Sequence, residues 1–412
     1  MGLQTGSQPI SWMTYLAILS VCLIINLPGV AISPIEGKLM ETLRSSELEI
    51  QLLTVLPNFI IIPFVLLAGK LSDYRYKLPL IWMALTIFLG CGVAFLLVNS
   101  MKGLIIVSCI LGCADGILIP FAMGFMVNTF QGRFRTTHLG IKSAVSNAGV
   151  VVATFVIGFL IGKERWQLPF SIYLVAILPL ALSYWLRYIP GFGKVPLVPS
   201  TRQRELSLQQ ECIRDIDSKK IWGLIGNNVW LSLVAFSIIL FVPQLVEQNG
   251  WEAKISADIT SLFFVFVLLA GCFLVPFVRT MKSWTLPFIG LFMFIGLGLI
   301  FFIPRIWAMY AGACFSGISF GFFQPLIYDK TGSAINNPAK NIFGLSLVLT
   351  ALYLAIAIVP FVITGVARLF SVSDENRFAF LLSLCLNGTY ILVAVLSRKG
   401  FTFGISPEYY SK

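Results

Sequence analysis

The chain has 412 residues, of which 58% are hydrophobic and 11% are charged, against roughly 25% charged residues in an average soluble domain. So little polar surface cannot keep a chain of this size dispersed in water, which excludes an ordinary soluble domain. The net charge of +11 would suit nucleic acid, but the basic residues are scattered over short segments between long apolar runs.

The apolar runs are long enough to cross a bilayer as helices. A span needs about 20 mostly apolar residues, because each residue rises about 1.5 Å through a hydrocarbon core about 30 Å thick. The runs are continuous and not alternating, which favours helices over a β-barrel. We therefore expect an all-α polytopic membrane protein with twelve transmembrane helices. The predicted spans are 11–33, 50–71, 78–99, 102–128, 137–162, 168–188, 221–246, 256–279, 284–303, 306–329, 340–365 and 376–396.

The basic residues predict the orientation of these spans. When the loops are assigned alternately to two sides, most of the 29 lysines and arginines fall on one side. By the positive-inside rule, both termini are then cytoplasmic. The first run has no basic segment before it and no cleavage site after it, so we expect it to remain as a span. We expect a monomer in the cytoplasmic (inner) membrane, in contact with the lipid bilayer and with no nucleic-acid partner.

The longest polar stretch, 189–220, follows the sixth span and predicts a cytoplasmic linker. It separates an N-terminal six-helix half, 1–188, from a C-terminal half, 221–412. From about Glu205 onward the linker is compatible with a short amphipathic surface helix.

A repeated glycine pattern supports this division. The fourth and tenth spans both read GxxxGxxxP, with Gly112, Gly116 and Pro120 matched by Gly317, Gly321 and Pro325. Glycines four residues apart leave a flat stripe that a neighbouring helix can approach closely. The sequence FVLLAG also occurs twice, at 64–69 and 266–271, but at a different offset, so it counts for less. The pattern predicts two parallel pseudo-repeats.

The loop after the second span reads GKLSDYRYK over residues 69–77. It resembles the signature GxLaDrxGrk of the major facilitator superfamily. Gly69, Leu71 and Asp73 match, Lys77 falls on a basic position, and Tyr76 replaces the second glycine. The resemblance implies the major facilitator fold, with these four matching residues in a cytoplasmic gating loop that latches the two halves.

The resemblance covers nearly the whole chain and is closest to bacterial drug and metabolite exporters. An Arg165-Trp166 step before the sixth span is similar to the usual WR of the family. The chain departs from drug/proton antiporters at two places. Ser108 stands where many of them have an arginine, and the stretch from Gly149 to Gly158 lacks the antiporter proline.

Asp115 is the most informative single residue, because it lies at the midpoint of the fourth span. A carboxyl group at that depth costs about 2.5–3.5 kcal/mol on insertion scales and usually faces a cavity or an ion path. We interpret Asp115 as the proton-coupling candidate, the alternative being a structural acid that hydrogen-bonds a neighbouring helix. The only histidine, His138, is expected to be a solvated residue at the membrane interface.

Other polar residues within spans form a candidate substrate-cavity lining. The resemblance implies that the first, fourth, seventh and tenth spans border a central cavity. Amide and phenol groups offer donors and acceptors without fixed charge, although each one alone is equally compatible with helix–helix contacts. With 35 phenylalanines, the chain favours a moderately apolar solute. The cavity candidates are Asn26, Asn147, Asn228, Gln324, Tyr328 and Tyr353.

Together these features predict a secondary active transporter for a small-molecule solute, with proton-coupled efflux preferred. An uptake symporter or a uniporter of the same fold is the first alternative. The second, from another class, is a lipid-handling protein or a membrane-embedded enzyme. The chain has no HExxH motif and no phosphate-binding GxxxxGK[ST] motif, so we expect no enzyme activity, no metal and no cofactor.

Overall fold

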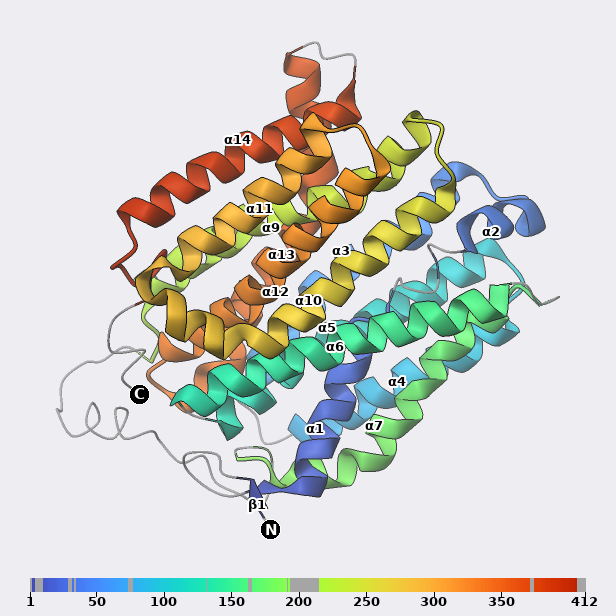
Figure 1. The fold of residues 1–412 in the computed structure, drawn as a ribbon. Helices are drawn as coiled ribbons and strands as arrows, with labels where there is room; N and C mark the ends of the chain where they lie inside the picture. The colour runs from blue at the N-terminus through green and yellow to red at the C-terminus, as the bar shows by residue number, and fades with distance from the viewer. Residues whose placement is uncertain are drawn as a thin grey trace, which may run out of the picture. The chain divides into compact units, whose positions relative to one another are not determined.

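The structure is a computed structural model that describes residues 2–3, 10–28, 32, 35–72, 77–130, 132–161, 165–190, 192, 215–370 and 374–405. This part of the chain is helical apart from a short antiparallel ribbon of β1 (Gly2–Leu3) and β2 (Ile10–Ser11), and a single bridge between Ile216 and Ile335 (Figure 1). The chain forms two compact units. Unit 1 comprises residues 1–138, 145–217 and 331–353, and unit 2 comprises residues 139–144, 218–330 and 354–412.

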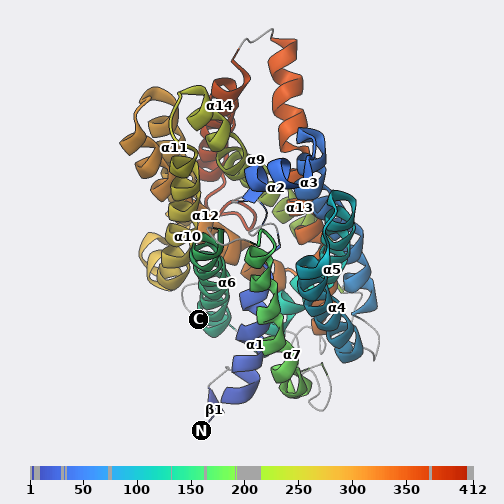
Figure 2. The same ribbon diagram turned by 90° about the vertical axis from the view of Figure 1, so that its right-hand side faces the viewer.

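Unit 1 contains the first predicted spans. Serine caps at Ser11, Ser46 and Ser100 begin three of its helices, and the Ser46 hydroxyl and the Glu49 carboxylate form a reciprocal capping box. Figure 2 shows α1 and α7 side by side in this unit. The elements are α1 (Trp12–Ile24), α2 (Glu36–Leu43), α3 (Glu47–Leu71), α4 (Lys77–Leu97), α5 (Met101–Thr129), most of α6 (Gly132–Ile161), η2 (Leu168–Ala176), α7 (Ile177–Leu182) and η3 (Ser183–Tyr188).

Unit 2 contains most of the remaining helices. Within it, α11 (Thr285–Phe302) and α14 (Glu375–Leu396) run side by side (Figure 1) and approach closely where Gly290 faces Ile391. Helix α13 (Asn341–Leu369) is divided between the units. The short η5 (Pro338–Lys340) and the part of α13 up to residue 353 belong to unit 1. The elements of unit 2 are α9 (Ser218–Gln248), α10 (Ala253–Met281), η4 (Lys282–Trp284), α11 (Thr285–Phe302), α12 (Ile306–Ser333), the second part of α13 (Asn341–Leu369) and α14 (Glu375–Leu396).

The predicted all-α polytopic fold is confirmed. Among the described residues, nine segments are long and apolar enough to cross a membrane, and one of them, Asp258–Phe302, contains both α10 and α11. Two shorter apolar helices, Trp12–Ile24 and Leu56–Leu71, cover most of the first and second predicted spans. Each of the twelve predicted spans therefore has a helical counterpart in the part of the chain that the structure describes.

The structure differs from the sequence-based expectations in three local details. The first span was predicted to reach residue 33, but α1 ends at Ile24. Pro28 explains the early end, because a proline ring clashes with the carbonyl four residues earlier and has no N–H to donate. The sixth span is confirmed at Leu168–Tyr188, although most of it is 3₁₀-helix, with prolines at 169 and 179. A short helix, α2, was not predicted.

The repeated glycines make the same contact in both units. In unit 1, a Cβ atom on Gly112 would lie 2.8 Å from the Pro57 carbonyl oxygen, and one on Gly116 would lie 2.8 Å from that of Ile61. In unit 2, Gly317 and Gly321 meet the carbonyl oxygens of Phe263 and Val267 in the same way. In each unit the glycine stripe of one helix therefore lies directly on the backbone of the helix two spans earlier, as expected for pseudo-repeats.

The second repeated sequence, FVLLAG, is not in the same register. Phe64, its first residue in unit 1, lies against Gly116, whereas Phe266, its first residue in unit 2, lies against Gly317. Ala270, one helical turn after Phe266, is the residue against Gly321. The two copies are therefore displaced by one turn relative to the glycine packing, which explains their different offset.

Candidate functional site

Asp115 is buried in the middle of α5. Its side chain is 2% exposed, and α5 extends from Met101 to Thr129 with the Ser100 hydroxyl capping its first turn. The neighbouring Gly116 places the backbone of α3 directly beside this turn, so close helix packing limits the access of solvent to the carboxyl group. The sequence predicted the depth of Asp115, and its role in proton coupling stays a prediction.

Two predicted cavity residues of unit 2 lie together. The Gln324 amide nitrogen on α12 is 3.2 Å from Oδ1 of Asn228 and 3.4 Å from the Ser232 hydroxyl, both on α9. The Gln324 Oε1 atom is buried and receives no hydrogen bond from the described residues. One turn away, Phe236 of α9 meets Phe320 of α12 at a ring-centroid distance of 5.7 Å. We call Asn228, Ser232 and Gln324 the amide cluster.

Sequence reasoning missed Ser232, although a signal was present. Asn228 and Ser232 are four residues apart on α9, so they lie on the same face of that helix. Phe236 continues the stripe, and Phe320 and Gln324 have the same spacing on α12. Two facing stripes of this kind predict a mixed polar and aromatic contact between the helices.

Tyr328 and Lys330 lie near the end of α12, and the structure places both in the interior. Tyr328 is 5% exposed and Lys330 is 4% exposed. The Lys330 ammonium donates to the main-chain carbonyls of Thr402 and Gly404, at 2.9 and 2.8 Å. Lys330 is therefore buried because the chain after α14 returns and covers it.

We call residues 398–405 the return segment. The side-chain amide of Asn227 also donates to the Thr402 carbonyl, at 2.8 Å. Phe403 contacts the rings of Trp230 and Tyr390 edge-on. The return segment is thus bound along α9, α12 and α14, all within unit 2.

The remaining cavity candidates belong to unit 1. Asn147 is buried on α6, in a stretch that packs on the last turn of α1, since the Ser146 hydroxyl donates to the Cys22 carbonyl at 2.7 Å. Asn26 is half-buried in the turn that follows α1, and Tyr353 is half-buried on α13. Their contribution to a solute cavity stays a prediction.

The predicted gating loop is described only at its ends. Gly69 lies so close to Ser346 of α13 that a side chain larger than hydrogen would overlap it, and Leu71 is the last residue of α3. The Lys77 ammonium, at the start of α4, is 5.4 Å from the centre of the Phe192 ring. Asp73 lies outside the described residues, as do most of the linker 189–220 and its predicted amphipathic helix.

His138 is buried, so the expectation of a solvated residue was wrong. Its Nδ1 atom lies 2.9 Å from the Tyr15 hydroxyl, and its ring stacks on Phe130 with centroids 3.7 Å apart. The side chain is 7% exposed. Aromatic neighbours from α1 and from the end of α5 enclose it, and the sequence around position 138 contains no sign of them.

Comparisons with known proteins agree with this architecture. Residues 14–242, more than half of the chain, match the family model described as Major Facilitator Superfamily, so the chain belongs to this superfamily. This is a superfamily of secondary transporters and not of enzymes.

One curated relative is the multidrug transporter protein MdtP of Bacillus subtilis. The two proteins are 27% identical over 106 residues, which cover 26% of this chain and 20% of MdtP. The match thus spans about a fifth of that relative.

Two solved structures share the fold at low sequence identity. The proton:xylose symporter XylE is 16% identical, with a TM-score of 0.70 over 97% of this chain and 98% of XylE. The human organic anion transporter MFSD10 is 12% identical, with a TM-score of 0.69 over 92% of this chain and 96% of MFSD10.

Proposed function

We propose that this chain exports a small, moderately apolar solute in exchange for protons, and that Asp115 is the group that exchanges them. The observation that supports this proposal is the position of Asp115, buried to 2% exposure at the midpoint of a long apolar helix. A carboxyl group at membrane depth is costly and usually marks an ion or substrate path. The segment shared with MdtP agrees with export.

The proposed cycle needs Asp115 to be accessible from each side of the membrane in turn. Facing the acidic side, the carboxylate takes up a proton while the solute leaves. Facing the cytoplasm, it releases the proton while the next solute binds. Coupling arises because solute binding and protonation favour different states, so neither can complete the cycle alone.

The amide cluster indicates the kind of solute. Asn228, Ser232 and Gln324 have no fixed charge, and the buried Gln324 Oε1 can accept a hydrogen bond. The rings of Phe236 and Phe320 provide an apolar surface one turn away. We propose a solute with an apolar body and at least one N–H or O–H donor.

Orientation and domain organisation belong to the same proposal. We propose two halves, 1–188 and 221–412, joined by a cytoplasmic linker at 189–220, in a monomer of the cytoplasmic membrane with both termini inside. The excess of basic residues on one side of the spans supports this orientation.

The test is transport into everted membrane vesicles under an imposed pH gradient. The substrate is first found with a panel of cationic, neutral and anionic amphipathic compounds. Asp115→Asn keeps the size and hydrogen bonding of the side chain but removes the titrating group, so we expect gradient-driven accumulation to be lost. Solute exchange without a gradient should survive, and Asp115→Glu should give a milder defect.

Asp258→Asn is the matched control, because it removes an exposed acid from α10 in unit 2. We expect it to transport like the wild type. Full gradient-driven export by Asp115→Asn would show that Asp115 is a structural acid. Uptake, or transport that ignores the gradient, would support an uptake symporter or a uniporter instead.

A further inference from the structure

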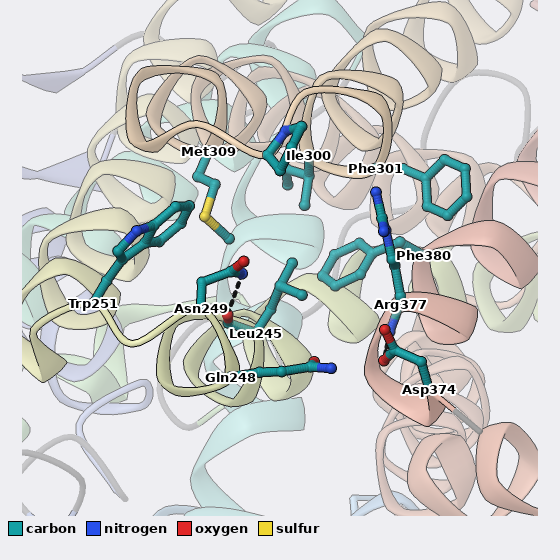
Figure 3. Close-up of a pocket in the computed structure, with 11 residues that line it drawn as sticks. Leu245, Gln248, Asn249, Trp251, Ile300, Phe301, Met309, Asp374, Arg377 and Phe380 are labelled. Atoms are coloured by element: carbon teal, nitrogen blue, oxygen red, sulfur yellow. Dashed lines mark hydrogen bonds between the residues drawn. The ribbon is translucent and has the colours of Figure 1, made fainter.

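A pocket of about 240 Å³ lies at one end of unit 2 and contains none of the residues discussed so far (Figure 3). It forms where α9 and α11 end and where α12 and α14 begin. The charge distribution predicts that this end of the helices faces the outside of the cell. A solute would therefore meet this pocket without entering the membrane interior.

The floor of the pocket is apolar and buried. Leu245, Ile300, Met309 and Phe380 are between 0% and 8% exposed. Trp251 also lines the pocket and is half-buried. An apolar group placed on this floor would be removed from water, which stabilises binding by about 25 cal/mol per Å² of apolar surface.

The rim is polar, and two of its acceptor atoms, one on Asp374 and one on Gln248, already accept hydrogen bonds. The Asp374 carboxylate caps α14, because its Oδ1 atom accepts a hydrogen bond from the main-chain N–H of Arg377, at 3.0 Å. Oε1 of Gln248 accepts a hydrogen bond from the side-chain amide of Asn376, at 3.4 Å. The Gln248 amide nitrogen remains available as a donor.

Arg377 provides the main available donor. Its guanidinium is exposed, lies 5.9 Å from the centre of the Phe301 ring, and makes no hydrogen bond or ion pair with the described residues. Figure 3 shows Arg377 beside Phe301 and Phe380 at the edge of the pocket. A guanidinium in this position offers parallel N–H groups that match the two oxygens of a carboxylate.

We propose that this pocket binds small amphipathic monocarboxylates, with the apolar end on the floor and the carboxylate on Arg377. The two available donors at the rim, the Arg377 guanidinium and the Gln248 amide, favour an acceptor head group, and the single arginine suits a single negative charge. Drug-sized ligands occupy pockets of roughly 300–1,000 Å³, so a cavity of about 240 Å³ suits a smaller molecule. The proposal does not depend on proton coupling or on the direction of transport.

The test is calorimetric binding to the full-length protein in lipid nanodiscs. The probes are phenylbutyrate, its neutral amide and phenylbutylamine, which share one apolar body and differ in the head group. We expect phenylbutyrate to bind best. Arg377→Gln should weaken its binding by at least about tenfold, because a charge-assisted bidentate contact is lost. Arg377→Lys should give an intermediate loss.

Two control variants test whether the weaker binding of phenylbutyrate is specific to Arg377. Arg368→Gln removes another exposed arginine of unit 2 that does not line the pocket, so binding should not change. Asp374→Asn keeps a good helix cap and should leave phenylbutyrate binding unchanged or stronger. The proposal is overturned if no probe binds, if Arg377→Gln binds phenylbutyrate normally, or if the amine binds best and Asp374→Asn weakens it.

Discussion

Helices α5 and α12 share one packing scaffold but have different chemistry. Both place two glycines four residues apart on the backbone of the helix two spans earlier. Asp115 precedes the second glycine of α5, whereas Phe320 precedes the second glycine of α12. The amide cluster occurs in unit 2 around Gln324, and the corresponding place in α5 is Ile119. The repeat therefore preserves the residues that determine helix packing, and the two halves have diverged at the residues that face other groups.

The largest expected effect comes from filling the shared scaffold. A side chain at Gly116 or Gly321 would meet the carbonyl oxygen of Ile61 at 2.8 Å or of Val267 at 2.6 Å, so the helices would have to separate. Overpacking of this kind costs about 1–3 kcal/mol. We expect Gly116→Val and Gly321→Val to lower the melting temperature by similar amounts, measured by thermal unfolding in detergent.

Two glycines in open space serve as controls for this prediction. Among the described residues, and apart from the adjacent residues and nearby backbone of the same helix, no heavy atom lies within 4 Å of a Cβ placed on Gly90 or on Gly365. Gly90→Ala and Gly365→Ala should therefore leave the melting temperature unchanged or raise it slightly, since alanine favours a helix. A large loss from only one of the two valine variants would show that the two stripes are not equivalent.

The second prediction separates the roles of the two helices. Gln324→Leu removes the amide that links α12 to Asn228 and Ser232. We expect it to raise the KM for the solute by about tenfold, because the solute loses a buried hydrogen-bond acceptor, while transport still follows the pH gradient. Asp115→Asn should do the reverse, losing the gradient response with a smaller change in solute affinity. Equal effects of both variants on both measurements would remove the distinction.

The smallest effect concerns the return segment of unit 2. Lys330→Met keeps much of the apolar length of the side chain but removes the donor to Thr402 and Gly404. We expect residues 398–405 to exchange their amide hydrogens faster, with a local loss of stability of about 0.5–1.5 kcal/mol. Hydrogen exchange with mass spectrometry measures this locally. Lys219→Met, which changes an exposed lysine at the start of α9, should leave the same amides unaffected.

The sequence was sufficient to predict the helices, because long apolar runs have few structural alternatives in a membrane. It also located the close contacts, because glycines four residues apart have a direct steric meaning on a helix. Its failures concern contacts between distant segments. The burial of His138 depends on Tyr15 and Phe130, and the burial of Lys330 depends on residues about seventy positions later.

The amide cluster lies between these two cases. Asn228 and Gln324 were recognised as polar residues at depth, but their mutual hydrogen bond depends on how α9 faces α12. Residue spacing predicts which residues share one face of a helix, but it does not predict which other helix that face contacts. For the same reason, the sequence placed Asp115 at mid-membrane depth without identifying the groups around it.

The return segment has a consequence for how the protein is made. Helix α12 is synthesised and inserted well before residues 402 and 404 exist, because Lys330 precedes Thr402 by 72 positions. During that interval its ammonium group has no carbonyl ligands from the return segment and must stay hydrated. We therefore expect this end of α12 to reach its final packing only after α14 has been inserted and residues 398–405 have left the ribosome. Unit 2 would then complete its assembly only when residues 398–405 are free of the ribosome, in a step that a ribosome stalled near residue 400 would prevent.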